Sequence, residues 1–299
     1  MTAARSARYR SPRHRQSIVR AQHFGLYLFL FTAALFFSIP LLIMISTSLK
    51  TAAEVRAGSV FALPVEPGFA AWTRAWGEAC IGRTCEGISA GLWNSVIILI
   101  PSTVLSVGLA ALNGYALSLW NVPRAGAILA ALLLGAFIPY QVMIYPLVRM
   151  ASTVGIYGSL PGIVAVHVIF GIPVLTLIFC NFYKGLPPEL IKAARVDGAG
   201  FFRIFRRIVL PMSGNIIIVA LILSVTGVWN DYLLSLIFAG RDNLPMTVQL
   251  ASLVGTRIGV PEYNVNMAAT LITALPPLLL YLLSGKYFVR GVTAGAIKG

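Results

Sequence analysis

The chain has 299 residues, of which 58% are hydrophobic and only 11% are charged. Soluble domains carry roughly a quarter charged residues, so this composition and the mean hydropathy of +0.84 exclude a soluble globular protein. The 23 basic and nine acidic residues give a net charge of +14. This charge does not indicate a nucleic-acid partner, because long uncharged apolar runs leave no surface for a basic binding face. The sequence indicates an integral membrane protein.

The first 23 residues are rich in Arg, Ser and His, and we expect them to form a disordered cytosolic tail. The apolar run that follows is longer than the core of a secretory signal, and no small-residue cleavage site closes it, so we expect it to be retained. Residues 24–289 are predicted to form one membrane domain, followed by a cytosolic tail at 290–299.

Six apolar segments are long enough to cross about 30 Å of hydrocarbon as helices of about 20 residues. The predicted fold class is therefore all-α integral membrane with six transmembrane helices. We place them near 24–48, 92–119, 126–148, 159–183, 210–238 and 264–287.

Between the first two spans lies the largest external loop, 50–91, which contains Cys80 and Cys85. Four intervening residues allow a small disulfide loop in an oxidising compartment, and two free thiols are the alternative. We expect no metal site, because two sulfurs fall short of the usual four ligands. Cys180 is interpreted as a packing residue.

Catalytic motifs do not fit this chain. The run Gly87-Ile88-Ser89-Ala90-Gly91 matches G-x-S-x-G, but that motif needs a preceding strand and a downstream acid and His. The downstream His167 falls inside a span, where no span core supplies an acidic partner, so we interpret it as a packing residue rather than a proton relay. With no P-loop and no H-E-x-x-H motif, we expect no enzyme activity, no cofactor and no ATP hydrolysis by this chain.

The basic residues divide unevenly between the two sides that the six spans define. The side holding both termini has 16 basic residues and two acids, whereas the other side has seven of each. By the positive-inside rule, the termini are predicted to be cytoplasmic.

The cytosolic loop 184–210 is predicted to form two short helices. Pro187 and Pro188 suit a helix start, Glu189 complements the helix dipole, and Asp197-Gly198 supplies a turn. A basic interfacial loop that only serves topology is the alternative interpretation.

This loop resembles the signature of binding-protein-dependent ABC importer permeases, written E-A-A, three residues, Gly, and later I-x-L-P. The matching residues are Ala193, Ala194, Gly198, Ile208, Leu210 and Pro211, and Lys192 stands where the family has Glu. In that family the loop docks on an ATP-binding subunit. The resemblance therefore implies a type I importer bundle whose coupling residues are Glu189, Leu190, Lys192, Ala193, Ala194, Asp197 and Gly198, with Leu190, Ala193 and Ala194 as apolar anchors.

Further matches point to the carbohydrate branch of the family, such as the smaller membrane subunit of maltose permeases. They are Ser48-Leu49-Lys50, Asn94-Ser95, Ala111-Leu112-Asn113-Gly114-Tyr115-Ala116-Leu117, Trp229-Asn230-Asp231 and the C-terminal run from Tyr287 to Gly299. The resemblance is greatest to permeases of the glucose/mannose type. It implies a permease subunit of an ATP-driven sugar importer in a bacterial inner membrane. Its implied partners are a second permease subunit, two ATP-binding subunits and a soluble sugar-binding protein.

A sugar pathway needs neutral hydrogen-bonding groups and aromatic faces in apolar walls. The candidates are Asn94, Asn113, Tyr115, Gln141, Asn230 and Asp231, and hydrogen bonding between helices is the alternative role for each. Asp231 is preferred, because an acid near a membrane span is costly enough to indicate a function. A stand-alone secondary transporter or channel is the alternative function, although the near absence of charge in the spans argues against ion coupling.

Overall fold

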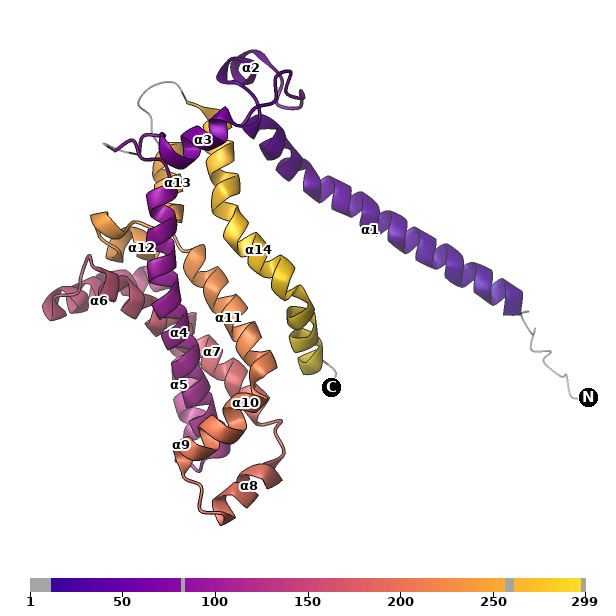
Figure 1. The fold of residues 1–299 in the computed structure, drawn as a ribbon. Coiled ribbons are helices and arrows are strands. Elements are labelled where there is room, and N and C mark those ends of the chain that lie inside the picture. The colour runs from indigo at the N-terminus through magenta and orange to yellow at the C-terminus, as the bar shows by residue number, and fades with distance from the viewer. Residues whose placement is uncertain (1–11, 82–83, 256–260, 297–299) are drawn as a thin grey trace, which may run out of the picture.

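The structure is a computed structural model that describes residues 12–81, 84–255 and 261–296. Its regular elements in this part of the chain are helices (Figure 1). In chain order they are α1 Pro12–Ser48, α2 Ala52–Ala57, α3 Ala70–Gly77, α4 Ser89–Leu119, α5 Ala125–Phe137, α6 Tyr140–Val154, α7 Leu160–Tyr183, α8 Pro188–Val196, α9 Phe201–Ile204, the π-helix η1 Phe205–Val209, α10 Leu210–Met212, α11 Gly214–Trp229, α12 Leu233–Phe238, the 3₁₀ helix η2 Arg241–Asn243, α13 Met246–Gly255 and α14 Tyr263–Ala296.

Within the described residues, four helices are each long and apolar enough to cross a membrane, and two bent pairs meet the same criteria together. The all-α membrane fold is thus confirmed, with six spans if each bent pair counts as one. The continuous spans are His23–Ser48, Ser89–Leu119, Leu160–Tyr183 and Tyr263–Gly285.

The third span was predicted as one helix over 126–148, and this prediction is wrong in shape. The chain turns by 100° between α5 and α6. Ile138 is extended, with ψ of 125°, because the ring of Pro139 disfavours helical geometry at the residue before it. The turn directs α6 away from the axis of α5 (Figure 1).

The fifth span, predicted as one helix over 210–238, is also interrupted. The segment Phe201–Met212 meets α11 at 82°, and α11 ends at Trp229 before the short α12 begins at Leu233. The carboxylate of Asp231 accepts hydrogen bonds from the amides of Leu234 and Ser235, at 3.3 and 2.7 Å. These bonds start a new helix, which the hydropathy pattern does not reveal.

The bundle is built on close packing between α4 and α7, with α11 and α14 alongside (Figure 1). Small residues permit this approach: a Cβ added at Gly114 of α4 would lie 2.5 Å from the Cβ of Phe179 on α7. Buried apolar side chains form three clusters along the bundle. One is centred on Tyr115 and Phe179, one on Ile163 and Phe238, and one on Trp229 and Met246.

Both ends of the chain are more helical than predicted. α1 begins at Pro12, inside the predicted tail 1–23, and α14 continues to Ala296, beyond the predicted domain end at 289. Adding residues to an existing helix is far easier than starting one, so the apolar spans extend into their flanks. Residues 1–11 and 297–299 lie outside the described residues.

The loop 50–91, which the sequence predicts to be external, is organised around Glu54 and a disulfide. Glu54 accepts hydrogen bonds from the amides of Thr51 and Val65, at 2.7 and 2.6 Å, and also from the amide of Glu66. The bond from Thr51, then that from Val65, are the largest causes that lower the pKa of Glu54 from 4.5 to about 2. Cys80 and Cys85 are joined by a disulfide between α3 and α4.

Candidate functional site

The cytosolic loop of the sequence analysis forms a compact unit at one end of the bundle, where α8 crosses below the other helices (Figure 1). Pro187 and Pro188 stand at the N-terminus of α8, and Asp197 is its C-cap residue. Gly198 follows with a φ of +73°, so the turn uses the left-handed region that glycine adopts without strain.

The inner face of α8 packs on the bundle through Ile191 and Ala194, which are 5% and 8% exposed. Both belong to the cluster that contains Tyr115, Phe179 and Tyr183. A spacing of three residues places them on one face of the helix. Ala194 was predicted to be an apolar anchor together with Leu190 and Ala193, but its side chain is covered by this chain, whereas those of Leu190 and Ala193 are exposed.

The outer face of α8 is free on this chain. The predicted coupling residues on it are all exposed: Glu189, Leu190, Lys192, Ala193 and Asp197. Val196 was not predicted, although it is 88% exposed and extends the apolar part of this surface. An apolar residue in the last turn of a short basic helix is the signal that could have identified it. We call these six exposed residues the outer face of α8.

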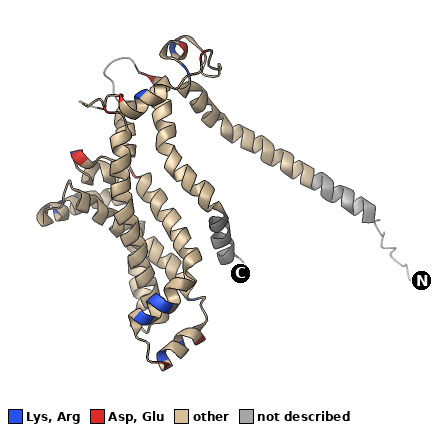
Figure 2. Cartoon of the chain, viewed as in Figure 1, with Lys and Arg blue, Asp and Glu red and all other residues tan. Residues whose placement is uncertain are grey.

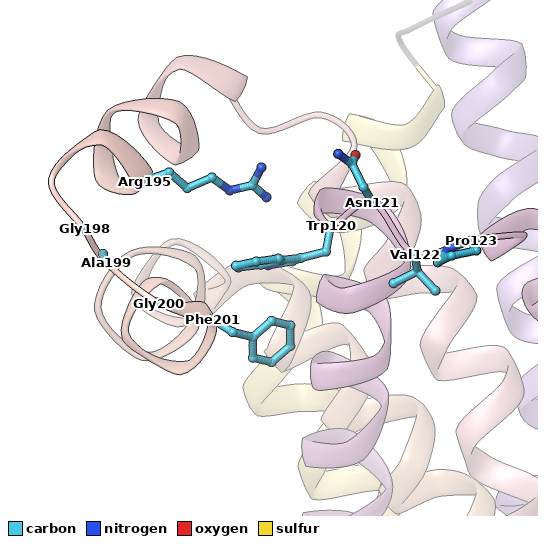
Figure 3. Close-up of a pocket in the computed structure, with 9 residues that line it drawn as sticks. All are labelled: Trp120, Asn121, Val122, Pro123, Arg195, Gly198, Ala199, Gly200 and Phe201. Atoms are coloured by element: carbon cyan, nitrogen blue, oxygen red, sulfur yellow. The ribbon is translucent and has the colours of Figure 1, made fainter.

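Arg195 joins α8 to the end of α4. Its Nη2 donates a hydrogen bond to the carbonyl oxygen of Leu119 at 2.7 Å, and its guanidinium carbon lies 4.4 Å from the centre of the Trp120 ring. Figure 3 shows Arg195 on one side of Trp120 and Phe201 towards the other. Such cation–π contacts contribute about 0.5–1 kcal/mol at exposed sites. These two contacts connect α8 directly to the end of α4.

Tyr115 reinforces the same joint. Its hydroxyl donates to the carbonyl oxygen of Phe201 at 3.1 Å, and its ring lies 4.7 Å from Phe201 and 5.2 Å from Phe205, centre to centre. The side chain is fully buried among these groups. Tyr115 was predicted as a candidate for the sugar pathway, and in this structure its side chain is covered by protein on all sides. It instead fastens α9 to α4.

An open pocket of about 710 Å³ lies between this joint and the turn at Gly198 (Figure 3). Its lining is Trp120, Asn121, Val122, Pro123, Arg195, Gly198, Ala199, Gly200 and Phe201. The pocket separates the turn from the bundle, so α8 is held by its inner face and by Arg195.

The structure does not gather the remaining pathway candidates into one site. Asn94 donates to the carbonyl oxygens of Asp242 and Leu244, at 3.3 and 3.1 Å, and so bonds α4 to the segment before α13. Gln141 and Asn230 are exposed, at the start of α6 and the end of α11, and Asn113 is half-buried within α4.

Asp231 has a neighbour that the sequence did not predict. The Nε2 atom of His167, on α7, lies 3.9 Å from Oδ2 of Asp231, and both side chains line a cavity of about 240 Å³. The statement that His167 has no acidic partner is wrong, because the break after α11 carries Asp231 into the bundle interior.

Charged residues are concentrated at the two ends of the bundle (Figure 2). Lys and Arg gather at the end formed by α8, α9 and η1, and most of the acidic residues belong to other parts of the chain. Among the described residues no group of three or more His, Cys, Asp or Glu could hold a metal ion.

The fold defines a multi-pass helical membrane protein with a basic loop at one end of its bundle, the class that contains transporter permeases. Residues 27–294 match the family described as binding-protein-dependent transport system inner membrane component. The chain belongs to this family, and its role is transport rather than enzyme catalysis. A stand-alone secondary transporter or channel does not fit this membership.

Curated relatives are ABC transporter permeases. The probable ABC transporter permease protein PH1216 of Pyrococcus horikoshii is 41% identical over 173 residues, a match that spans 58% of this chain and 62% of that protein. The xylose/arabinose import permease XacI of Haloferax volcanii is 29% identical, over 87% of this chain and 89% of its own. The glucose import permease GlcU of Saccharolobus solfataricus is 30% identical, over 91% and 95%.

The fold is that of a solved importer. A chain of a bacterial ABC transporter involved in the import of the acidic polysaccharide alginate superposes with a TM-score of 0.71, over 94% of this chain and 99% of that one. Its sequence identity is 21%, so the likeness concerns the fold. The predicted type I importer permease fold is confirmed.

Proposed function

We propose that this chain forms half of the translocation pathway of an ATP-driven sugar importer and couples to ATP-binding subunits through the outer face of α8. One observation carries the proposal. A short helix is fixed to the bundle by a buried inner face and by Arg195, while its other face remains exposed. A nine-residue helix is too short to be stable alone, and an exposed apolar face on it suits a groove in a partner.

In this mechanism, ATP binding closes two partner subunits on each other and displaces α8. The joint of Arg195, Trp120 and Tyr115 passes the displacement to α4, and through the α4–α7 packing to the rest of the bundle. The bundle then switches as rigid bodies between inward- and outward-open states. The chain itself performs no chemistry.

The proposed substrate class is supported by the relatives, since XacI and GlcU are named for import of xylose, arabinose and glucose. We infer a neutral sugar, with glucose, mannose or a related monosaccharide as the first to test. A soluble binding protein is expected to deliver it to the end formed by the external loop.

The second membrane subunit is proposed from α1. No residue in the apolar stretch of the span His23–Ser48 is buried by this chain. In Figure 1, α1 diverges from the bundle. A second permease subunit beside α1 would cover part of that surface. The uneven distribution of Lys and Arg supports cytoplasmic termini.

The experiment that tests this function is reconstitution. The chain is tagged in its native membrane, purified with its partners, and placed in liposomes loaded with ATP. We expect co-purification of ATP-binding and permease subunits, and uptake of a sugar from a panel of glucose, mannose and xylose only when binding protein and ATP are present. Sugar uptake by the isolated chain, or purification as a homo-oligomer alone, would contradict the proposal.

A further inference from the structure

The cavity beside His167 has the composition of a binding site inside the membrane domain. It occupies about 240 Å³ between α7 and the broken fifth span. Besides His167 and Asp231, its lining includes Phe170 and Gly171 from α7 and Ser224 and Gly227 from α11. Small residues leave the space open, and irregular backbone at membrane depth is tolerated where it lines a cavity.

Asp231 keeps acceptor capacity after capping α12. Its two carboxylate oxygens each accept one amide hydrogen bond, from Leu234 and Ser235. A carboxylate has about four acceptor sites, so roughly half of them remain. Its side chain is 12% exposed and lines the cavity.

His167 carries the second observation. Its side chain is 6% exposed, and its Nε2 atom has no hydrogen-bond partner among the described residues. The 3.9 Å to Oδ2 of Asp231 is too long for a direct hydrogen bond. Buried polar atoms nearly always have a hydrogen-bond partner. The separation of Nε2 of His167 and Oδ2 of Asp231 therefore suits a third group that lies between them.

We propose that His167 and Asp231 bind a hydroxyl group of the transported sugar. A single hydroxyl oxygen about 2.8 Å from each of the two atoms would complete both hydrogen bonds across the 3.9 Å separation. Phe170 supplies an aromatic face for the apolar side of a sugar ring. The volume lies below the range of about 300–1,000 Å³ for drug-sized ligands, so the site receives one sugar ring rather than a chain. This inference rests on the proposed function as a sugar importer.

The test compares a sugar with its monodeoxy analogues in the reconstituted complex. The parent sugar is the member of the panel that the wild-type complex transports fastest. Each monodeoxy analogue is supplied at a concentration that saturates the binding protein. We expect the wild type to transport one deoxy analogue more slowly than the parent sugar, by a factor of about five or more. His167→Leu should slow the parent sugar to the rate of that analogue while leaving the analogue almost unaffected, and His167→Gln, which keeps a hydrogen-bonding group, should restore part of the difference.

Thr176→Val is the matched control, because Thr176 is a buried polar residue of α7 outside this cavity. It should leave the ratio of the two rates unchanged. The inference is overturned if no deoxy analogue is discriminated by the wild type, or if both His167 variants slow the two sugars equally. In either case parent-sugar uptake by the wild type would leave the proposed function intact, whereas absence of that uptake would remove the function itself.

Discussion

At the scale of single residues, conformation and hydrogen bonding decide which positions of this chain resist change. Gly198 has a φ of +73°, yet a Cβ added there would meet nothing within 4 Å. Gly198 is therefore favoured by the backbone conformation of the turn and not by a lack of space for a side chain. Glu54 illustrates hydrogen bonding, since its carboxylate accepts bonds both at the start of α2 and from the loop at Val65.

The turn after α8 gives the first prediction. Gly198→Val should abolish sugar uptake, because a β-branched residue in the left-handed region costs about 1–3 kcal/mol and would reorient α8. Gly198→Asn should retain most uptake, because asparagine visits that region. Uptake by the reconstituted complex, normalised to membrane levels, measures both. Equal activity of the two variants would show that the turn geometry is irrelevant to coupling.

The second prediction concerns the pH dependence of the external loop. The pKa of Glu54 is lowered, so its stabilising contribution is complete above about pH 4.5 and is lost as the pH falls towards 2. We expect the hydrogen-exchange protection of the Val65 and Glu66 amides to decrease over that interval. In Glu54→Gln these amides should be less protected at neutral pH and should show no such decrease. Unchanged protection in the wild type at low pH would contradict this assignment.

At the scale of elements, hydropathy predicted where helices cross but not where they bend. Segments of uncharged residues located the four continuous spans and the two bent pairs, because length and apolarity are what crossing the bilayer demands. The restart at Leu233 depends on capping by Asp231, so composition alone predicted a continuous fifth span. The turn at Pro139 has a cause in the sequence, but Pro101 and Pro173 lie inside unbroken helices, so the presence of a proline did not by itself locate the turn. The same limit hid the pairing of His167 with Asp231, which lie 64 positions apart.

The orientation of α8 could likewise not be predicted from the sequence. Apolar residues occur on both of its faces, since Ile191 and Ala194 point inwards while Leu190 and Val196 point outwards. The motif placed Ala193 and Ala194 together in one docking role. Packing against Tyr115 and Phe179 separates them, because adjacent residues of a helix are 100° apart around its axis.

This separation gives the third prediction. Ala193→Asp should leave membrane levels near normal and reduce both uptake and co-purification of the ATP-binding subunits, because it changes only the exposed surface. Ala194→Asp should lower the membrane level of the chain, because it buries an unpaired charge in the cluster around Tyr115. Immunoblots of membranes and of affinity-purified complexes distinguish the two effects. The assignment of faces would be reversed if Ala194→Asp accumulated normally and Ala193→Asp did not.

At the scale of the whole molecule, the bundle links two ends of different character. One end carries the external loop with its disulfide, and the other carries the basic loop with α8 (Figures 1 and 2). Between them, α4 runs from the cluster at Trp229 to the joint at Trp120 and packs on α7 along its length. A movement at α8 can therefore reach the cavity beside His167 through one continuous helix pair.

The most direct test of this account is a cross-link from the outer face of α8 to an ATP-binding subunit. Ala193→Cys is introduced into the full complex, with Arg149→Cys, exposed at the external side of the predicted topology, as the matched control. The native thiol of Cys180 is buried, so the unmodified chain sets the background. With a short thiol cross-linker we predict that Ala193→Cys joins the ATP-binding subunit and that the cross-link stops ATP-driven uptake, whereas Arg149→Cys gives no such product. A cross-link from Arg149→Cys to that subunit, or ATP-driven uptake that continues at full rate after Ala193→Cys is cross-linked, would contradict the account.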